Sequence, residues 1–265
     1  MRAFPVSALI LLALAGLPAT GLAAPACPAP HPMHFQVTGR FQAGIEGFTE
    51  GLEVHDGDLY ESTGAMDGTT RLLRITPKGH AAVLADFGDR FFGEGLTFLD
   101  GRLYQLSWRD HKVFVYDRHW RLLRTMVNPH EGWGLTNDGR RLIYGDGSDT
   151  LYFADPADFR TLATVKVRRG GQPVSNINEL EYVGGKIYAN IWQTRAIVRI
   201  DPRTGCIEAE ARLDTLWDHM SQAERNYTGV DPDFVLNGIA YDPARRLFYL
   251  TGKEWPMIFT GRFQG

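Results

Sequence analysis

Apolar side chains along the chain alternate with polar ones or occur in blocks of four to six residues bounded by turn-forming residues. This period of two is typical of β-strands, whereas amphipathic helices repeat every 3.6 residues. The segment from Leu216 to Arg225 differs, because Trp217, Met220 and Ala223 would share one face of a helix. We therefore expect an all-β protein with one short helical insertion.

A short phrase recurs five times along the chain. Its first residue is polar or Trp, its second is small or Glu, and its third is apolar. A turn and a strand with aromatic residues follow. The copies are Glu50-Gly51-Leu52, Glu94-Gly95-Leu96, Trp133-Gly134-Leu135, Asn178-Glu179-Leu180 and Asn237-Gly238-Ile239. Their apolar residues are 44, 39, 45 and 59 positions apart. Repeats of roughly 40 to 50 residues with several strands each indicate propeller blades.

The first four repeats contain signals for further strands after the phrase. The pairs Asp56-Gly57, Asp100-Gly101, Asp138-Gly139 and Gly184-Gly185 predict tight hairpin turns of type I′, which need positive φ at both central residues. Third strands are predicted at Arg71–Ile75, Val113–Tyr116, Thr150–Phe153 and Ile197–Ile200. Outer fourth strands follow, for example at Arg121–Val127 and Thr161–Val167.

The fifth repeat is too short for four strands, because only Pro256–Phe263 remains after Tyr249. The N-terminal segment His34–Thr38 can supply the missing strand and leave no free sheet edge. The prediction is a five-bladed β-propeller of four-stranded antiparallel blades, with the ring closed by an N-terminal strand. A two-sheet sandwich is the alternative, but it would not repeat one phrase five times.

The first residues have the pattern of a signal peptide. Arg2 is followed by an apolar stretch from Ala8 to Leu17 and by small residues up to Ala24. The apolar stretch is too short for a membrane span. We expect residues 1–24 to be removed, residues 25–265 to form a single domain, and the protein to be exported to a bacterial periplasm. Secretion, or a lipid anchor at Cys27, are the alternatives. Export permits a disulfide between Cys27 and Cys206.

Composition and charge exclude several classes of protein. With 44% hydrophobic and 22% charged residues, the chain is globular rather than disordered. A net charge of −3 provides no electrostatic footprint for nucleic acid. No cluster of residues has metal-ligand spacing, and no Gly-x-Ser-x-Gly phrase marks a serine hydrolase. We expect a monomer without a metal or cofactor.

The repeat places chemically useful side chains at one mouth of the propeller. Inner strands of a propeller converge on its axis, so the residues that begin the five phrases should face one another: Glu50, Glu94, Trp133, Asn178 and Asn237. The ends of the hairpins add Trp108, Trp192 and Lys253. Packing alone would not select such a ring of carboxyls, amides and indoles.

These phrases resemble the plant-and-bacterial-type glutaminyl-peptide cyclotransferases over Phe48 to Trp255. The matching phrases are Phe48-Thr49-Glu50-Gly51-Leu52, Phe92-Gly93-Glu94-Gly95-Leu96-Thr97, Glu131-Gly132-Trp133-Gly134-Leu135, Asn178-Glu179-Leu180-Glu181-Tyr182, Asn190-Ile191-Trp192-Gln193 and Leu250-Thr251-Gly252-Lys253. Each phrase is weak evidence alone, but six in order are specific. The resemblance implies a five-bladed propeller with a metal-free active site on its axis and N-terminal Gln peptides as substrates.

The implied reaction is the attack of an N-terminal α-amine on the side-chain amide of its own Gln residue. Ammonia leaves and a pyroglutamyl residue remains. By resemblance, Glu94 is the general acid and base, with a pKa raised by apolar neighbours such as Phe92 and Trp108. Lys253 or Asn178 would donate to the oxyanion.

The resemblance also implies a substrate-binding set: Phe48, Glu50, Trp108, Trp133, Trp192 and Asn237. Glu50 departs from the family pattern, which has Gln at this position. Two carboxyls near one mouth repel each other, so Glu50 could raise the pKa of Glu94 or recognise the substrate ammonium group.

Two other functions compete with this interpretation. A propeller can bind a peptide or protein partner on its top surface without catalysis. Propellers that process sugars or lactones commonly hold a central metal, for which Glu50, Glu94, Asn178 and Asn237 could be ligands. Placement of Glu94 among aromatic residues, rather than on a broad exposed patch, favours the cyclotransferase.

Overall fold

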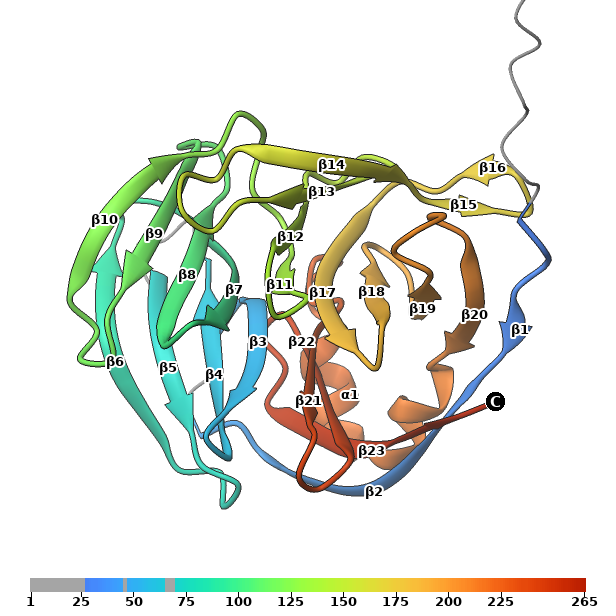
Figure 1. Cartoon of the computed structure of the whole chain (residues 1–265). Helices are drawn as coiled ribbons and strands as arrows, with labels where there is room; N and C mark the ends of the chain where they lie inside the picture. Colours follow the sequence, from blue (N-terminus) through green and yellow to red (C-terminus); the bar gives the residue numbers. More distant parts are fainter. Residues whose placement is uncertain (1–26, 45–46, 65–69) are drawn as a thin grey trace, which may run out of the picture.

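The computed structural model describes residues 27–44, 47–64 and 70–265. Within these ranges, five blades surround a common axis, and each blade is built on four antiparallel strands (Figure 1). The predicted five-bladed all-β propeller is confirmed. The proposed signal peptide, residues 1–24, lies outside the described residues.

The first three blades follow one another along the chain, each from its inner to its outer strand. Blade 1 contains β3 (Thr49–His55), β4 (Asp58–Thr63), β5 (Thr70–Ile75) and β6 (Ala81–Gly88). Blade 2 contains β7 (Gly93–Leu99), β8 (Arg102–Ser107), β9 (Lys112–Tyr116) and β10 (Leu122–Val127). Blade 3 contains β11 (Leu135–Asn137), β12 (Leu142–Gly145), β13 (Thr150–Ala154) and β14 (Thr161–Lys166).

The last two blades depend on the N-terminal segment. Blade 4 contains β17 (Ile177–Val183), β18 (Lys186–Ile191), β19 (Ala196–Ile200) and β20 (Ile207–Arg212), and β1 (His31–Pro32) adds to its edge. Blade 5 contains β21 (Leu236–Asp242), β22 (Leu247–Gly252), β23 (Met257–Gln264) and β2 (His34–Gln42). A small hairpin, β15 (Arg168–Arg169) and β16 (Gln172–Pro173), connects blades 3 and 4.

The ring is closed by strand exchange between the two ends of the chain, as predicted. Strand β2 pairs with β23 in antiparallel register, from His34 opposite Gln264 to Gln42 opposite Met257. A disulfide between Cys27 and Cys206 ties the same N-terminal segment to blade 4. The disulfide joins residues 179 positions apart, so it limits the freedom of the unfolded chain, whereas strand β2 covers the edge of blade 5.

The inner strands pack so closely around the axis that the repeated phrase needs a small residue. A Cβ atom on Gly95 would overlap the backbone of Leu135, and one on Gly134 would overlap the carbonyl of Asn178. Glycine at the second position of the phrase is therefore required by the neighbouring blade.

Blade 4 is the exception, because Glu179 stands where the other phrases have glycine. Its buried side chain accepts hydrogen bonds from the backbone N–H groups of Leu52 at 3.2 Å and Ile239 at 2.8 Å. Burial and the nearby carboxyl of Glu181 raise the pKa of Glu179 well above its usual value. Glu179 thus joins blade 4 to blades 1 and 5.

Three of the four predicted type I′ turns have positive φ at both central residues, for example Asp56 (49°) and Gly57 (83°). The prediction is wrong for Asp138-Gly139, where only Gly139 has positive φ. Strand β11 ends at Asn137 and β12 begins at Leu142, so the loop has more residues than a tight hairpin. The carboxyl of Asp138 closes this loop by accepting from the N–H groups of Arg140 and Arg141.

The predicted helix over Leu216–Arg225 is two short helices. A 3-10 helix, η1 (Asp214–His219), ends at Met220, and α1 (Gln222–Thr228) begins after Ser221. The side chain of Ser221 accepts from the N–H of Glu224, and the Glu224 carboxyl accepts from the N–H of Ser221. This capping box starts a new helix at the point where a single helix was expected.

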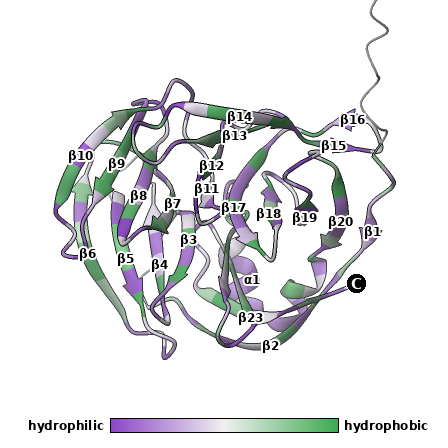
Figure 2. Ribbon diagram, in the orientation of Figure 1, coloured by the Kyte–Doolittle hydropathy of each residue, from purple (hydrophilic) through white to green (hydrophobic). Residues whose placement is uncertain are grey.

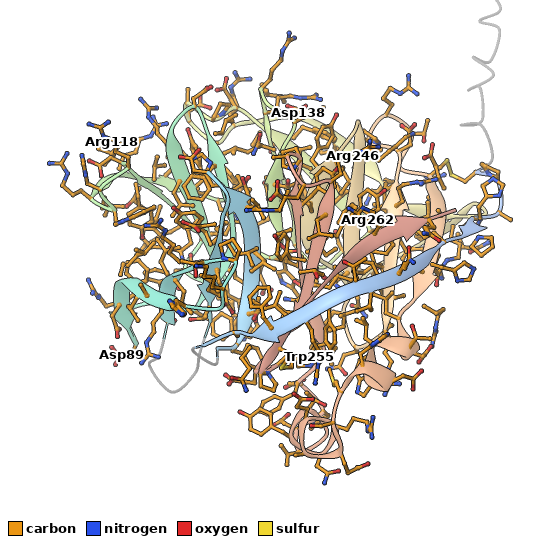
Figure 3. All side chains as sticks on the ribbon, turned by 90° about the horizontal axis from the view of Figure 1, so that it is seen from below. Asp89, Arg118, Asp138, Arg246, Trp255 and Arg262 are labelled. Carbon is orange, nitrogen blue, oxygen red and sulfur yellow. A yellow bond between two sulfur atoms is a disulfide. The ribbon has the colours of Figure 1, made fainter. Side chains whose placement is uncertain are left out.

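Apolar residues from adjacent sheets fill the spaces between blades. Figure 2 shows hydrophobic and hydrophilic residues interspersed along the strands, and in the outer strand β20 the two kinds alternate. Trp255 is buried between the last blade and η1, where its ring meets that of Trp217 edge to face at 4.9 Å (Figure 3). Charged side chains such as Arg118 and Asp89 project from the periphery. None of the helices in the described ranges is long and apolar enough to span a membrane.

Stability should depend on pH through Glu61, a carboxyl buried on β4. Its Oε1 lies 2.6 Å from the hydroxyl of Thr49, and burial raises its pKa from 4.5 to about 7. Above pH 4.5 the folded state retains a proton that the unfolded chain releases, so the free energy of unfolding falls as the pH rises towards 7. In Glu61→Gln, the decrease in the free energy of unfolding between pH 4.5 and 7 should be smaller than in the wild type by about 3 kcal/mol. Urea unfolding across this pH range measures it, and parallel curves for the two proteins would contradict the assignment.

Candidate active site

A cavity of about 320 Å³ opens at the end of the propeller where the repeated phrases begin. Its lining comes from all five blades and consists of five aromatic and five polar side chains. The lining residues are Phe48, Glu50, Phe92, Glu94, Trp108, Trp133, Asn178, Trp192, Asp233 and Lys253. An apolar cavity with a few converging polar groups is the usual form of a small-molecule site.

The structure brings together the predicted site residues, with one exception. Asn237 is fully buried behind the cavity surface. Its Nδ2 donates to the carbonyl of Thr49 at 2.8 Å and to Oε2 of Glu50 at 3.2 Å. Asn237 therefore supports Glu50 rather than lining the cavity.

A buried ion pair lies in the cavity wall. Nζ of Lys253 donates to Oε1 of Glu50 at 2.7 Å, and both side chains are more than nine-tenths buried. Lys253 also lies 4.6 Å from the centre of the Phe48 ring. Glu50 thus has both oxygens occupied, one by Lys253 and one by Asn237. Burial raises the pKa of Glu50 and the charge of Lys253 opposes that effect.

Glu94, at the start of β7, has the most altered environment of the cavity carboxyls. Burial raises its pKa well above 4.5, and the negative charges of Glu50 and Glu131 add to the rise, whereas Lys253 opposes it. A carboxyl with such a pKa can both accept and donate a proton near neutral pH.

Aromatic rings form two walls of the cavity, and the rings within each wall are in contact. Phe92 contacts Phe48 edge to face at 6.3 Å and Trp108 at 5.5 Å. On the other side, Trp133 and Trp192 meet edge to face at 5.6 Å. Such walls exclude water and offer flat surfaces to a substrate.

Asn178 provides an unused polar atom. Its Oδ1 is buried and has no hydrogen-bond partner within the described part of the chain. Buried polar atoms without partners are uncommon in folded proteins. Since Asn178 also lines the cavity, its amide is placed to bind a polar group of a ligand.

Sequence reasoning missed Asp233 and the role of Glu131. Asp233 lies in the loop that follows the helical insertion, outside the repeat, and its Oδ1 accepts from Nε2 of Gln193 at 2.8 Å. The signal for it is the spacing of 59 residues between the fourth and fifth phrases, which is longer than the others. Glu131 lies within a matching phrase, but the hydrogen bonds that it accepts from the indole N–H groups of Trp108 and Trp133 depend on the fold.

Two observations bear on the alternative of a central metal held by Glu50, Glu94, Asn178 and Asn237. In the described ranges, no group of three or more His, Cys, Asp or Glu side chains is arranged to hold a metal ion. Moreover, the ammonium group of Lys253 occupies the side of Glu50 that a cation would need.

The fold and the cavity together define a five-bladed propeller with an axial pocket, lined by aromatic side chains and by two buried carboxyls whose pKa values are raised. A family model described as glutamine cyclotransferase matches residues 8–263. The chain is 34% identical over 229 residues to a glutaminyl-peptide cyclotransferase of Arabidopsis thaliana, covering 84% of this chain and 69% of that protein. A solved structure of Myxococcus xanthus glutaminyl cyclase superposes with a TM-score of 0.76 at 33% identity, covering 89% of this chain and 98% of the other. The protein belongs to the glutamine cyclotransferase family.

The ion pair can be tested by a double-mutant cycle. Lys253→Met leaves Glu50 buried without its cation and should lower the free energy of unfolding by about 3 kcal/mol. In the double variant Glu50→Gln/Lys253→Met no charge remains unpaired, so most of this loss should be recovered. Urea unfolding of the two single variants and the double variant measures the coupling, and additive effects would contradict it.

Proposed function

We propose that this protein is a glutaminyl-peptide cyclotransferase, which converts N-terminal glutaminyl residues of peptides and proteins to pyroglutamate with release of ammonia. Membership of the family supports the reaction. The observation that carries the mechanism is the buried carboxyl of Glu94 in an aromatic cavity, under the opposing charges of Glu50 and Lys253.

Glu94 is the proposed catalytic acid and base. The neutral α-amine attacks Cδ of its own Gln side chain, and a bond forms between the α-nitrogen and Cδ. Glu94 takes a proton from the α-nitrogen and returns it to the amide nitrogen, and the bond between Cδ and that nitrogen breaks. Ammonia leaves and Glu94 regains its initial state. A pKa raised towards neutrality suits both transfers.

Lys253 and Asn178 are the proposed donors to the oxyanion that forms on the amide oxygen. Lys253 has three N–H donors, of which Glu50 engages one at 2.7 Å. Asn178 lines the same cavity, and Nδ2 of its amide is the donor, because Oδ1 can only accept. Donors already in place stabilise developing charge without reorganisation during the reaction.

The aromatic walls supply proximity. Nucleophile and electrophile belong to one residue, so a cavity that holds the Gln side chain folded back removes much of the entropic barrier. Phe48, Trp108, Trp133 and Trp192 are the proposed walls for this conformation.

Glu50 has a charge-setting role in this proposal. Because its two oxygens are engaged by Lys253 and Asn237, it is poorly placed to bind a substrate ammonium group. Its charge raises the pKa of Glu94, and its ion pair holds Lys253 at the cavity wall. Of the two roles expected from the sequence, these contacts favour the first.

We also propose that the chain is exported by a signal peptide at residues 1–24, to the periplasm, and acts as a monomer without a metal. The Cys27–Cys206 disulfide supports an oxidising compartment. The acid–base residues and the oxyanion donors named above provide the chemistry that the reaction requires.

The proposal predicts that Glu94→Gln loses turnover and keeps the fold. Removal of a general acid and base costs roughly two to four orders of magnitude in kcat. Ammonia release from a Gln-initiated dipeptide, in the presence of chelator, measures this loss.

The matched control is Glu208→Gln on the outer strand β20, which makes the same chemical change far from the axis and should keep the wild-type rate. Near-wild-type turnover of Glu94→Gln would rule out this mechanism. Wild-type release that stops with chelator would instead indicate a metal. No release by the wild type would favour a propeller that only binds peptides.

A further inference from the structure

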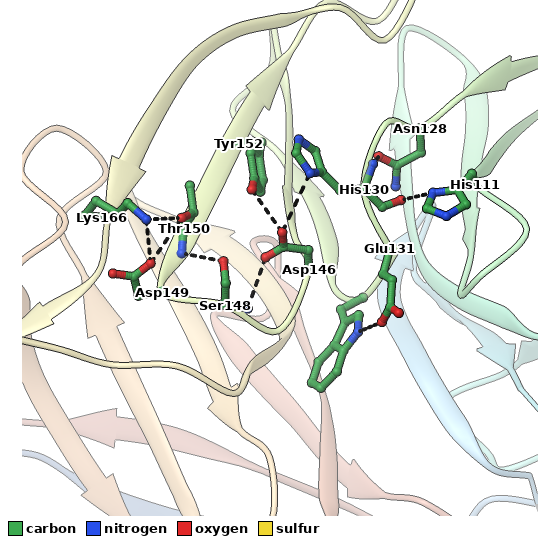
Figure 4. A network of polar contacts seen from close by, with 11 residues as sticks. His111, Asn128, His130, Glu131, Asp146, Ser148, Asp149, Thr150, Tyr152 and Lys166 are labelled. Atoms are coloured by element: carbon green, nitrogen blue, oxygen red, sulfur yellow. Dashed lines mark hydrogen bonds and ion pairs between the residues drawn. The ribbon is translucent and has the colours of Figure 1, made fainter.

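One carboxylate connects the two aromatic walls of the cavity. Glu131 lies in the loop between β10 and β11, and its Oε2 accepts from the indole N–H of Trp108 at 3.1 Å and from that of Trp133 at 3.5 Å. Figure 4 shows Glu131 directed at an indole ring. The two indoles come from different blades, Trp108 after β8 and Trp133 before β11.

The surroundings of Glu131 hold its side chain in this position. The guanidinium of Arg109 lies 3.7 Å from the centre of the Trp108 ring, and its Nε donates to Oε1 of Glu131 at 3.4 Å. The carboxylate is therefore shared by two indoles and one cation. Charge-assisted hydrogen bonds of this kind are stronger than those between neutral groups.

The backbone of the loop is fixed on both sides of Glu131. The N–H of Gly132 donates to the carbonyl of Trp108 at 3.0 Å, and the N–H of Trp133 donates to the carbonyl of Gly145 at 3.1 Å. The carbonyl of His130 is 2.8 Å from Nδ1 of His111 (Figure 4). A residue held in this way can set the orientation of its neighbours.

Through Glu131 the walls become one continuous surface. Trp108 packs on Phe92, and Trp133 packs on Trp192, so the carboxylate links the pair on one side of the cavity to the pair on the other. Without it, each indole N–H would lose this acceptor and each ring would gain freedom to rotate.

We propose that Glu131 is a positioning residue for the reaction, which orients the Trp108 and Trp133 rings so that they hold the substrate's Gln side chain folded back. This inference rests on the proposed function. The carboxylate acts through the indoles and makes no contact with the reacting atoms.

Glu131 also has an electrostatic effect on Glu94, and two variants of Glu131 distinguish this effect from its hydrogen bonding. Its negative charge contributes to the raised pKa of Glu94. In Glu131→Gln an acceptor oxygen remains for an indole, but the charge is lost. In Glu131→Ala both the acceptor and the charge are lost.

The test compares both variants with the wild type and with Glu208→Ala, a control on the outer strand β20. For the Gln-initiated dipeptide, Glu131→Ala should raise KM about tenfold, as expected for the loss of hydrogen bonds to a charged acceptor. Glu131→Gln should keep KM within a few-fold of wild type.

In both variants the acidic limb of the kcat/KM profile should move to lower pH, since the pKa of Glu94 falls.

Tryptophan fluorescence, with acrylamide quenching, reads the positions of the indoles without reference to activity. Glu131→Ala should change the emission and increase the quenching, whereas Glu208→Ala should not. Unchanged KM and unchanged fluorescence in Glu131→Ala would overturn the proposal, as would a Glu131→Gln variant that raises KM as much as Ala does. If the wild type releases no ammonia, the proposed function fails. The fluorescence test does not depend on activity, so unchanged fluorescence in Glu131→Ala would overturn the positioning of the indoles in that case too.

Discussion

The close approach of five inner strands around one axis is the constraint on which the site depends. Because neighbouring backbones nearly touch, positions such as Gly95 and Gly134 have no room for a side chain. The residue before each of them, Glu94 or Trp133, is thereby brought to the same mouth of the propeller. The packing of the ring and the position of the candidate site are thus two consequences of one repeated phrase.

The same geometry decides the electrostatics of the mouth. Converging strands and aromatic rings exclude water, so burial raises the pKa values of Glu50 and Glu94. Lys253 offsets part of this effect, but it is bound to Glu50 at 2.7 Å. Glu94 is left with burial and like charges acting together, which is why its pKa is raised well above the usual value. In our account, Glu94 can transfer protons because burial and neighbouring charges raise its pKa.

The repeat made the number of blades, the closing strand and most of the cavity lining predictable from the sequence. What it could not predict depends on contacts between residues outside the phrase. Asp233 reaches the cavity from the loop after the helical insertion, and Glu131 acquires its role only because two indoles from different blades meet its carboxylate. Asn237 occupies the right position in the phrase, yet its side chain turns behind Glu50, an orientation that side-chain packing decides.

The titration of Glu94 tests the central claim most directly. Infrared difference spectra between the wild type and Glu94→Gln, recorded across a pH series, isolate the carboxyl of this residue from the other buried acids. The account predicts that a protonated carboxyl band attributable to Glu94 persists well above pH 4.5, the usual value for a glutamate. A Glu94 carboxyl that ionises near pH 4.5 would contradict the account, because it would then be too weak a base and too scarce an acid for both proton transfers.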